Sequence, residues 1–421
     1  MGTRPPTDST VRESGMTERV EVAVVGGGLA GAAVATALAR AGRDVVVIER
    51  QPVWRWRACG VFSSPASVVE LARLGLDAGT IRQVGRSIPA MRVETPGGTT
   101  FRLTYGSESE QAAGAIGFDR SGLDDALLRL AQEAGADVRR GTTVVSLDLP
   151  RSAGTREPTT LGIEGGRRIQ ARVVVGADGI RSVVARAAGV ARRARLPPRI
   201  GLTYHLKGDD DSAHDARMVV IPGGYCGIAP VPGGLVNVGI VLEDRVRLRQ
   251  LESDGAAAVT ESVVAALPPL PDGGFEPWRT GSRVEPVAGA WPLGHRVSRR
   301  AGDGWLLVGD AAGFLDPFTG EGIHRALVSA RLAAAAIGGH LAGRSGALPA
   351  YERAMSNRFS GKDVVSWLVQ MFLGRRALFE YAARRLASRP AERQTMSLVM
   401  SDLVPARGAL DPRFLAALLV P

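Results

Sequence analysis

Four residues near the start of the chain have the types and spacing needed to bind a dinucleotide. Gly26, Gly28 and Gly31 form a Gly-x-Gly-x-x-Gly pattern. In this pattern the first glycine permits a tight turn, the second lets backbone approach a pyrophosphate, and the third allows close helix packing. Glu49 follows at about the 20-residue spacing at which an acid accepts hydrogen bonds from an adenosine ribose. Because this carboxylate disfavours a 2′-phosphate, we expect FAD or NAD at this site.

The surrounding segments predict the elements that position these residues. Residues 22–25 are all apolar, as in a strand buried on both faces of a parallel sheet. Residues 29–41 read as a helix whose first residues, Leu29 and Ala30, present N–H groups and a positive dipole end to the pyrophosphate. Residues 44–50 read as a second strand that ends in Glu49 and Arg50. Together these segments predict a βαβ unit whose cofactor contacts are Gly26, Gly28, Leu29, Ala30, Gly31, Glu49 and Arg50.

Two later segments repeat the pattern of a buried strand followed by an acid. Asp178 and Gly179 follow an apolar run and precede a helix, and Gly309 and Asp310 do the same near residue 310. A loop rich in proline and glycine then leads from Asp310 to a further helix. We expect both segments at the same cofactor.

The order of these three motifs resembles the superfamily of FAD-dependent aromatic hydroxylases and geranylgeranyl reductases. The resemblance spans most of residues 20–420. Gly313, together with the Thr-Gly-Glu-Gly-Ile run at 319–323, most resembles the geranylgeranyl-reductase-like branch, since aromatic hydroxylases usually have a histidine where Gly313 stands. The resemblance implies FAD as cofactor and NAD(P)H as a transient electron donor. It also implies an α/β fold: a Rossmann-like FAD-binding domain with an inserted antiparallel β-sheet substrate domain and a C-terminal helical extension.

The same resemblance implies roles for individual residues. Arg120 matches the arginine that contacts the cofactor phosphates or the isoalloxazine, and Val144 stands where backbone faces the adenine. Asp310 is suited to accept hydrogen bonds from ribityl hydroxyls, and the helix that begins near Ile323 directs its positive end at the flavin N1 and O2. The predicted cofactor residues beyond the first unit are Arg57, Arg120, Val144, Asp178, Gly179, Gly309, Asp310, Pro317, Gly320, Gly322 and Ile323.

Four residues are candidates for catalysis. Glu321 and His324 flank the helix predicted to face the flavin and are the obvious proton-transfer groups, although a first-turn histidine fits a structural role equally well. Cys59 belongs to a Cys-Gly pair that resembles the family segment near the flavin face, or it is a small buried hydrophobe. Tyr225 begins the segment where flavin halogenases carry Trp-x-Trp-x-Ile-Pro. That signature is absent and no lysine precedes residue 207, which argues against halogenation.

Three functions remain open. The favoured prediction is a monooxygenase that uses O₂ and a flavin C4a-hydroperoxide to hydroxylate or epoxidise a lipophilic polyketide, aromatic or terpenoid metabolite in secondary metabolism. The alternative is a reductase that saturates isoprenoid double bonds. The third is a non-catalytic flavin-binding protein. A lipophilic substrate is expected because the predicted inserted sheet and C-terminal helices carry many apolar and few charged side chains.

Composition limits the other classes of partner. The net charge is +10, but the basic residues are scattered, so no nucleic-acid partner is expected. Two cysteines and no His/Cys cluster give neither a disulfide scaffold nor a metal site, which favours a cytoplasmic protein. No secretory signal or membrane-spanning run is evident. A predicted helix at 364–378 would pack on its own core in preference to a membrane surface, and the protein is expected to be a monomer or dimer.

Strand and turn signals divide the chain into four parts. A hairpin is predicted over 91–105 and a three-stranded meander over 216–243. The predicted parts are a flexible N-terminal segment (1–18), an FAD-binding domain in three pieces (19–85, 113–190 and 283–345), a substrate domain in two pieces (86–112 and 191–282) and a C-terminal helical region (346–421).

Overall fold

The computed structural model describes residues 17–54, 56–105, 114–150, 157–208, 214–243, 245–270 and 276–419. It confirms the predicted βαβ unit, with strand β1 (Thr17–Val25), helix α1 (Leu29–Arg40) and strand β2 (Val45–Glu49). Strands β1 and β2 pair in parallel. Most of the segment 1–18, which we predict to be flexible, lies outside the described residues, and its last two residues already belong to β1.

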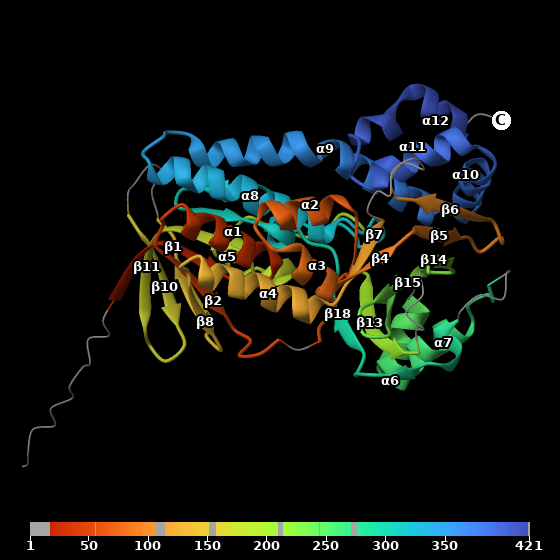
Figure 1. Cartoon of the computed structure of the whole chain (residues 1–421), viewed down its shortest axis with the longest axis horizontal. Coiled ribbons are helices and arrows are strands. Elements are labelled where there is room, and N and C mark those ends of the chain that lie inside the picture. Colours follow the sequence, from red (N-terminus) through yellow and green to blue (C-terminus); the bar gives the residue numbers. More distant parts are fainter. Residues whose placement is uncertain are drawn as a thin grey trace, which may run out of the picture.

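Strand β1 lies inside a large mixed sheet that forms one lobe of the molecule (Figure 1). The strand order is β20-β21-β11-β1-β2-β8, and β9 and β10 add to β11. Helices α1, α4 and α8 pack against one another over one face, while α5 packs near the other. The bounds are β8 (Asp137–Arg140), β9 (Val144–Asp148), β10 (Thr159–Ile163), β11 (Arg168–Gly176), β20 (Ala301–Gly302), β21 (Trp305–Leu307), α4 (Arg120–Glu133), α5 (Val183–Ala187) and α8 (Gly322–Leu341).

A second sheet forms the other lobe, in the order β17-β13-β16-β15-β14-β5-β6, with β18 paired to β13. It confirms the predicted hairpin, β5 with β6, and the predicted meander, β14 to β16. Strands β17 and β18 fall in the piece 283–345 or at its boundary, which the sequence assigned to the FAD-binding domain, yet both pair with β13. The bounds are β5 (Ala90–Glu94), β6 (Thr100–Thr104), β13 (Ile200–Lys207), β14 (Ala216–Ile221), β15 (Gly224–Val231), β16 (Leu235–Leu242), β17 (Ser282–Arg283) and β18 (Ala288–Ala290).

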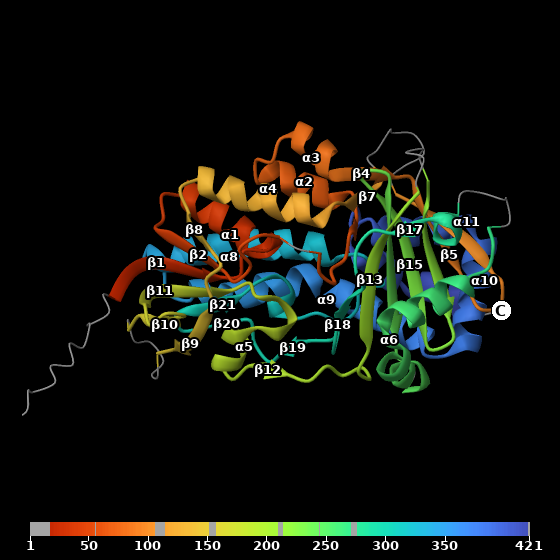
Figure 2. The ribbon, with the colours of Figure 1, turned by 90° about the horizontal axis from the view of Figure 1, so that it is seen from below.

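Helices cover both faces of this second sheet (Figure 2). Helix α6 (Arg245–Ala265) packs on the outer face through Val259 and Val263. Helix α9 (Ala347–Leu373) and the C-terminal helices α10 (Arg376–Ser388), α11 (Pro390–Met400) and α12 (Pro412–Leu419) pack toward the inner face. The single helix predicted over 364–378 is wrong, because α9 ends at Leu373 and Gly374 separates it from α10.

Short elements connect the two lobes. A small sheet of β3, β7 and β4 lies between them, and β12 pairs with β19. Among the described residues no helix is both long and apolar enough to cross a membrane. The remaining bounds are β3 (Phe62–Ser63), β4 (Gly85–Ile88), β7 (Ala115–Phe118), β12 (Ala191–Arg192), β19 (Arg296–Val297), α2 (Ala66–Arg73), α3 (Ala78–Val84), α7 (Pro277–Thr280), and the short 3₁₀ helices η1 (Gly179–Arg181), η2 (Gly309–Ala312) and η3 (Ala406–Leu410).

Candidate cofactor and substrate site

The glycine loop at the end of β1 is shaped by close backbone contacts. Gly26 has φ +101°, and a Cβ atom there would lie 2.5 Å from the carbonyl oxygen of Ala177. A Cβ atom on Gly31 would lie 1.9 Å from the carbonyl oxygen of Gly26. Both positions therefore require glycine, as expected for a loop on which a pyrophosphate rests. Gly28 precedes α1 without any side-chain cap, while Leu29 and Ala30 are buried in its first turn.

Glu49 is buried beside this loop. Its Oε2 accepts a hydrogen bond of 2.7 Å from the backbone N–H of Gly27, and its Oε1 accepts one of 2.8 Å from Gln51. The carboxylate is thus held at the end of β2 where a ribose is expected. Arg50, the next residue, is exposed.

Two arginines converge on Asp124 close to the glycine loop. Arg57 Nη2 lies 2.6 Å from Asp124 Oδ2, and Arg120 Nη2 lies 3.3 Å from Oδ1. Arg120 also donates to the carbonyl of Gly60 at 2.7 Å. A Cβ atom on Gly28 would lie 3.5 Å from Arg57 Nη2, so this guanidinium reaches the loop. Asp124 was not predicted as a site residue, although its position four residues after Arg120 in a helix is a signal for such a pair.

Unpaired donors mark the space around these arginines. Arg120 Nε and Trp54 Nε1 are buried without a hydrogen-bond partner among the described residues. Two guanidinium groups lie over the Trp54 ring, with Arg57 at 4.6 Å and Arg140 at 5.6 Å from its centre. A buried N–H without a partner costs free energy. Donors and positive charge directed at one space fit an anionic dinucleotide.

Cys59 lies in a small pocket with Arg57 and Arg120. Burial raises the pKa of its thiol, and the Asp124 carboxylate acts in the same direction, although Arg120 opposes both. The thiol is therefore held in its protonated form, which is not the reactive nucleophile.

Asp310 faces the same group of arginines. Solvent reaches its side chain, yet desolvation by the surrounding protein raises its pKa against the opposing charges of Arg120, Arg325 and Arg57. A Cβ atom on Gly309 would lie 2.9 Å from the Cβ atom of Ala30. The Gly-Asp segment is thus brought against the first turn of α1, as the cofactor prediction requires.

The Asp-Gly segment also reaches the glycine loop, through Ala177. The carboxylate of Asp178 turns toward helix α5, where its Oδ2 accepts from the N–H of Val183. Its Oδ1 is buried without a partner within the described part of the chain, and burial raises its pKa. Gly179 has φ +75°, and Val144 lies half-buried at the start of β9. Direct contact of these residues with the cofactor stays a prediction.

The loop that follows Asp310 is held by a buried polar network centred on Asp316. Asp316 Oδ1 accepts hydrogen bonds from the hydroxyl of Tyr225 at 2.6 Å and from Gln370 Nε2 at 2.8 Å. Its Oδ2 accepts from Arg199 at 2.9 Å. Burial raises the pKa of Tyr225 well above its usual value, and Asp316 adds to this effect. Tyr225 thus keeps its proton and ties the loop to β15, while a catalytic role for it stays a prediction.

Glu321 and His324 lie in a second buried cluster, behind the loop. Glu321 accepts from Ser366 at 3.1 Å and lies 4.0 Å from Lys362 Nζ. His324 Nδ1 lies 3.1 Å from Asp402 Oδ2. Burial raises the pKa of Glu321, with Lys362 opposing, whereas His324 and Lys362 together overcome burial and hold the pKa of Asp402 well below its usual value. Neither Glu321 nor His324 lines the cavity described next, so their catalytic roles stay predictions.

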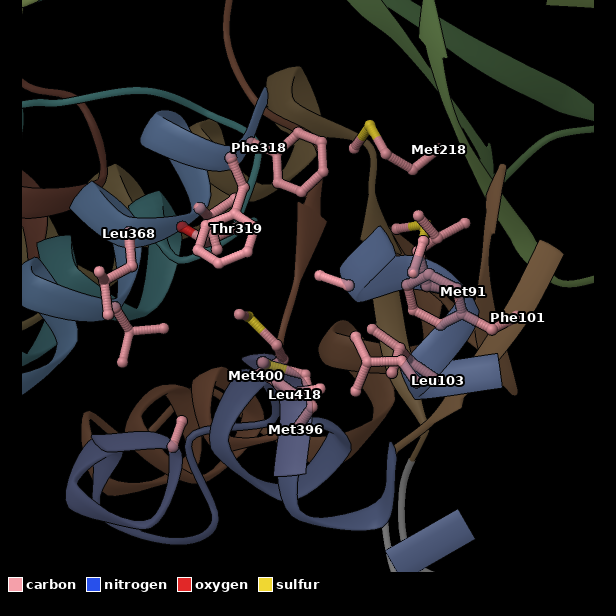
Figure 3. Close-up of a pocket in the computed structure, with 18 of the residues that line it drawn as sticks. Met91, Phe101, Leu103, Met218, Phe318, Thr319, Leu368, Met396, Met400 and Leu418 are labelled. Atoms are coloured by element: carbon pink, nitrogen blue, oxygen red, sulfur yellow. The ribbon is translucent and has the colours of Figure 1, made fainter. Parts of the chain in front are cut away.

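An apolar cavity adjoins the loop (Figure 3). Met91, Phe101 and Met218 line it from the second sheet, and Phe318 and Thr319 line it from the loop. The C-terminal helices supply the opposite wall, including Met396, Met400 and Leu418.

The loop that walls the cavity also carries residues predicted to contact the flavin. Gly320 has φ +65°, and a Cβ atom there would lie 2.6 Å from the ring of Phe62, another cavity residue. Pro317 precedes Phe318, and Gly322 and Ile323 open helix α8 without a side-chain cap. The cavity thus ends where the flavin is expected.

Comparison with known proteins agrees with this geometry. A sequence profile described as "FAD binding domain" matches residues 19–198. The menaquinone reductase of Mycolicibacterium smegmatis is 33% identical over 344 residues, which cover 76% of this chain and 76% of that protein. The chain belongs to the superfamily of FAD-dependent aromatic hydroxylases and geranylgeranyl reductases. It is an enzyme, an FAD-dependent oxidoreductase, as the sequence predicted.

The chain is also similar in sequence to a second reductase and in structure to a solved reductase-like protein. Digeranylgeranylglycerophospholipid reductase 1 of Methanopyrus kandleri is 31% identical over 329 residues, covering 74% of this chain and 79% of that protein. A solved structure described as geranylgeranyl bacteriochlorophyll reductase-like, from Thermoplasma acidophilum, has a TM-score of 0.72 at 21% identity and covers 96% of this chain and 97% of its own. The likeness to this structure confirms the predicted fold class.

Proposed function

We propose that this flavoprotein is a reductase that saturates a carbon–carbon double bond in the isoprenoid part of a lipid. The apolar cavity carries the proposal, because it offers a long chain an almost purely hydrocarbon wall next to the loop of Thr319 and Gly320. The names of the two reductases to which the chain is similar support this function over the monooxygenase favoured from sequence.

Each part of the site has a role in this function. Arg57, Arg120 and the glycine loop bind the cofactor phosphates, and Asp310 binds the ribityl chain. Reduced FAD supplies the hydride when bound. The cavity excludes water and holds the chain in place through apolar contacts worth about 25 cal/mol per Å² buried. NAD(P)H is the proposed electron donor and docks near residues 178–181.

The proton that completes the saturation requires an acid near the loop of Thr319 and Gly320. Glu321 is the candidate on this chain, because burial raises its pKa and its Oε2 has no hydrogen-bond partner among the described residues. Ser366 holds the other oxygen. Thr319 lies on the cavity wall, and only Gly320 stands between it and Glu321 in the chain. The proton therefore passes Gly320 to reach the cavity.

Mass spectrometry of the lipid product tests the proposed reaction. The FAD-loaded protein is reduced by dithionite without oxygen and incubated with geranylgeraniol, whose double bonds dithionite alone does not reduce. The expected product has gained a pair of hydrogen atoms. A product that has instead gained an oxygen atom, formed only when air and NADPH are supplied, would establish the monooxygenase. An unchanged lipid under both conditions would contradict both reactions.

A further inference from the structure

Two glycines leave bare backbone in the middle of the second sheet. Gly227 of β15 and Gly239 of β16 are directly opposed in register. Both strands are interior strands of the sheet, yet both glycines are partly exposed. The outer face at this point is closed, because the neighbouring residues Ile228 and Val238 are buried under α6. The opening therefore lies on the inner face, which also faces the cavity.

Protein atoms do not crowd the positions directly above these glycines. A Cβ atom on Gly239 would meet nothing nearer than Asn237 Oδ1 at 3.8 Å and the carbonyl of Gly227 at 3.9 Å. A Cβ atom on Gly227 would have the terminal carbon of Met218, at 3.4 Å, as its nearest neighbour. Met218 lines the apolar cavity. The bare floor thus begins beside a residue of the cavity wall.

Polar groups bound the far side of this floor. Asn237 donates from Nδ2 to Thr203 Oγ1 at 2.9 Å, which leaves its Oδ1 on the side of Gly239. His205 stands opposite Asn237 in the register of β13 and β16. Cross-strand neighbours of this kind have Cβ atoms about 5 Å apart. Hydrogen-bonding groups therefore replace the apolar side chains of β5 and β14 at this end of the sheet.

His205 is held in one orientation and has one nitrogen free. Its Nδ1 lies 2.8 Å from Glu285 Oε1, which also accepts a 2.6 Å hydrogen bond from the backbone N–H of His205. The ring of Trp56 lies 4.2 Å from the His205 ring, centre to centre. The residue is buried, and its Nε2 has no partner in the described part of the chain. Because Nδ1 must carry a proton to bond to the Glu285 carboxylate, Nε2 is a buried hydrogen-bond acceptor that lacks a donor.

We propose that the floor of Gly227 and Gly239, with Asn237 and His205 at its edge, is a head-group subsite. It receives a flat ring that carries hydroxyl groups, as in a quinol, while the apolar cavity receives the attached chain. Bare backbone accepts a flat face, and Asn237 Oδ1 and His205 Nε2 accept hydrogen bonds from hydroxyl groups at its rim. A charged phosphate fits less well, because the inner-face residues at this floor carry no lysine or arginine, and Lys207 lies exposed at the end of β13.

This inference rests on the proposed function, and the test separates the two. Binding to the oxidised, FAD-loaded protein is measured by calorimetry with two probes: 1-naphthol, which is a hydroxylated ring without a chain, and farnesol, which is a chain without a ring. The variant Gly227→Leu fills the floor. We expect it to weaken 1-naphthol binding by at least about tenfold and to change farnesol binding by less than about twofold. The variant His205→Asn keeps an amide N–H for Glu285 but removes the acceptor at Nε2, and it should weaken 1-naphthol binding by about fivefold.

A matched control comes from the same sheet. Gly289 of β18 is exposed and lies against Leu202, whose side chain belongs to the outer-face core, so Gly289→Leu should leave both probes unaffected. Loss of FAD from Gly227→Leu would overturn the subsite, because the floor would then belong to the cofactor. Unchanged 1-naphthol binding in Gly227→Leu would also overturn it, as would binding of inorganic pyrophosphate in competition with 1-naphthol. Failure of farnesol to bind the unaltered protein would instead contradict the proposed function.

Discussion

Around the glycine loop, shape is set by backbone contacts, whereas around the cavity it is set by side chains from distant parts of the chain. Gly31 and Gly26 touch within one short segment, and Glu49 is fixed by two backbone N–H groups. The cavity instead combines Met91 and Met218 of the second sheet with residues of the last helices. The first arrangement tolerates almost no substitution, while the second tolerates changes that keep volume and polarity.

The largest effect is expected in the glycine loop. Gly31→Ala places a Cβ atom 1.9 Å from a backbone oxygen, and neither backbone segment is free to move. We expect the purified protein to be colourless or insoluble, as measured by flavin absorbance per protein. Gly338→Ala is the matched control, because a Cβ atom at this other helical glycine meets nothing within 4 Å. A yellow, soluble Gly31→Ala protein would refute the close packing.

A smaller loss is expected from the arginine pair. Arg120→Met removes a buried cation and its unpaired Nε, while Arg57 still neutralises Asp124. Hydrogen bonds to charged groups contribute about 1.5–3 kcal/mol, so FAD affinity should fall by roughly 10- to 100-fold. Titration of the apoprotein with FAD, followed by flavin fluorescence, measures the change. Arg129→Met, on the exposed side of the same helix, should bind FAD normally.

A change in the cavity should leave the cofactor in place. Leu103 lines the apolar wall from β6, and Leu103→Trp fills part of the cavity. We expect the farnesol dissociation constant to rise by about tenfold, with an overpacking cost of about 1–3 kcal/mol in stability and full FAD occupancy. Val69→Trp, at an exposed position, serves as the control. An equal loss of FAD binding and farnesol binding would show that the cofactor site and the cavity do not act independently.

The smallest effect is expected for the pH dependence of stability, through the buried cluster of Glu321 and His324. Burial raises the pKa of Glu321, so the folded protein retains a proton that the unfolded chain releases above about pH 4.5. Stability from this group therefore falls as pH rises from there through the folded pKa. Glu321→Gln should remove this slope in urea unfolding measured from pH 4.5 to 8. The exposed Glu133→Gln should keep it. A slope unchanged in Glu321→Gln would place the titration elsewhere.

The two regions also differ in how far the sequence predicts them. Gly26, Gly31 and Glu49 are close in the chain, so local spacing suffices to place them. The hairpin and the meander follow from alternation and turns, and the structure confirms both. The role of Asp316 was missed, because its partners Arg199 and Tyr225 are about a hundred residues away.

Tertiary placement also changes what individual side chains can do. Tyr225 and Glu321 are candidates for catalysis in the sequence, and the structure shows both hydrogen-bonded to side chains from other parts of the chain. His205 and Glu285 carry no sequence signal, since their pairing depends on the path from β13 to the segment after β17.

The order in which the parts occur along the chain has a consequence for biosynthesis. Every predicted FAD contact precedes residue 324, whereas one wall of the cavity comes from residues 365–418. Domains generally begin to fold in the order in which the ribosome releases them. A nascent chain can therefore take up FAD while Met91, Phe101 and Met218 are still uncovered. Chaperones are expected to bind this protein during that interval. The supply of the vitamin precursor of FAD should therefore influence the yield of fully folded protein.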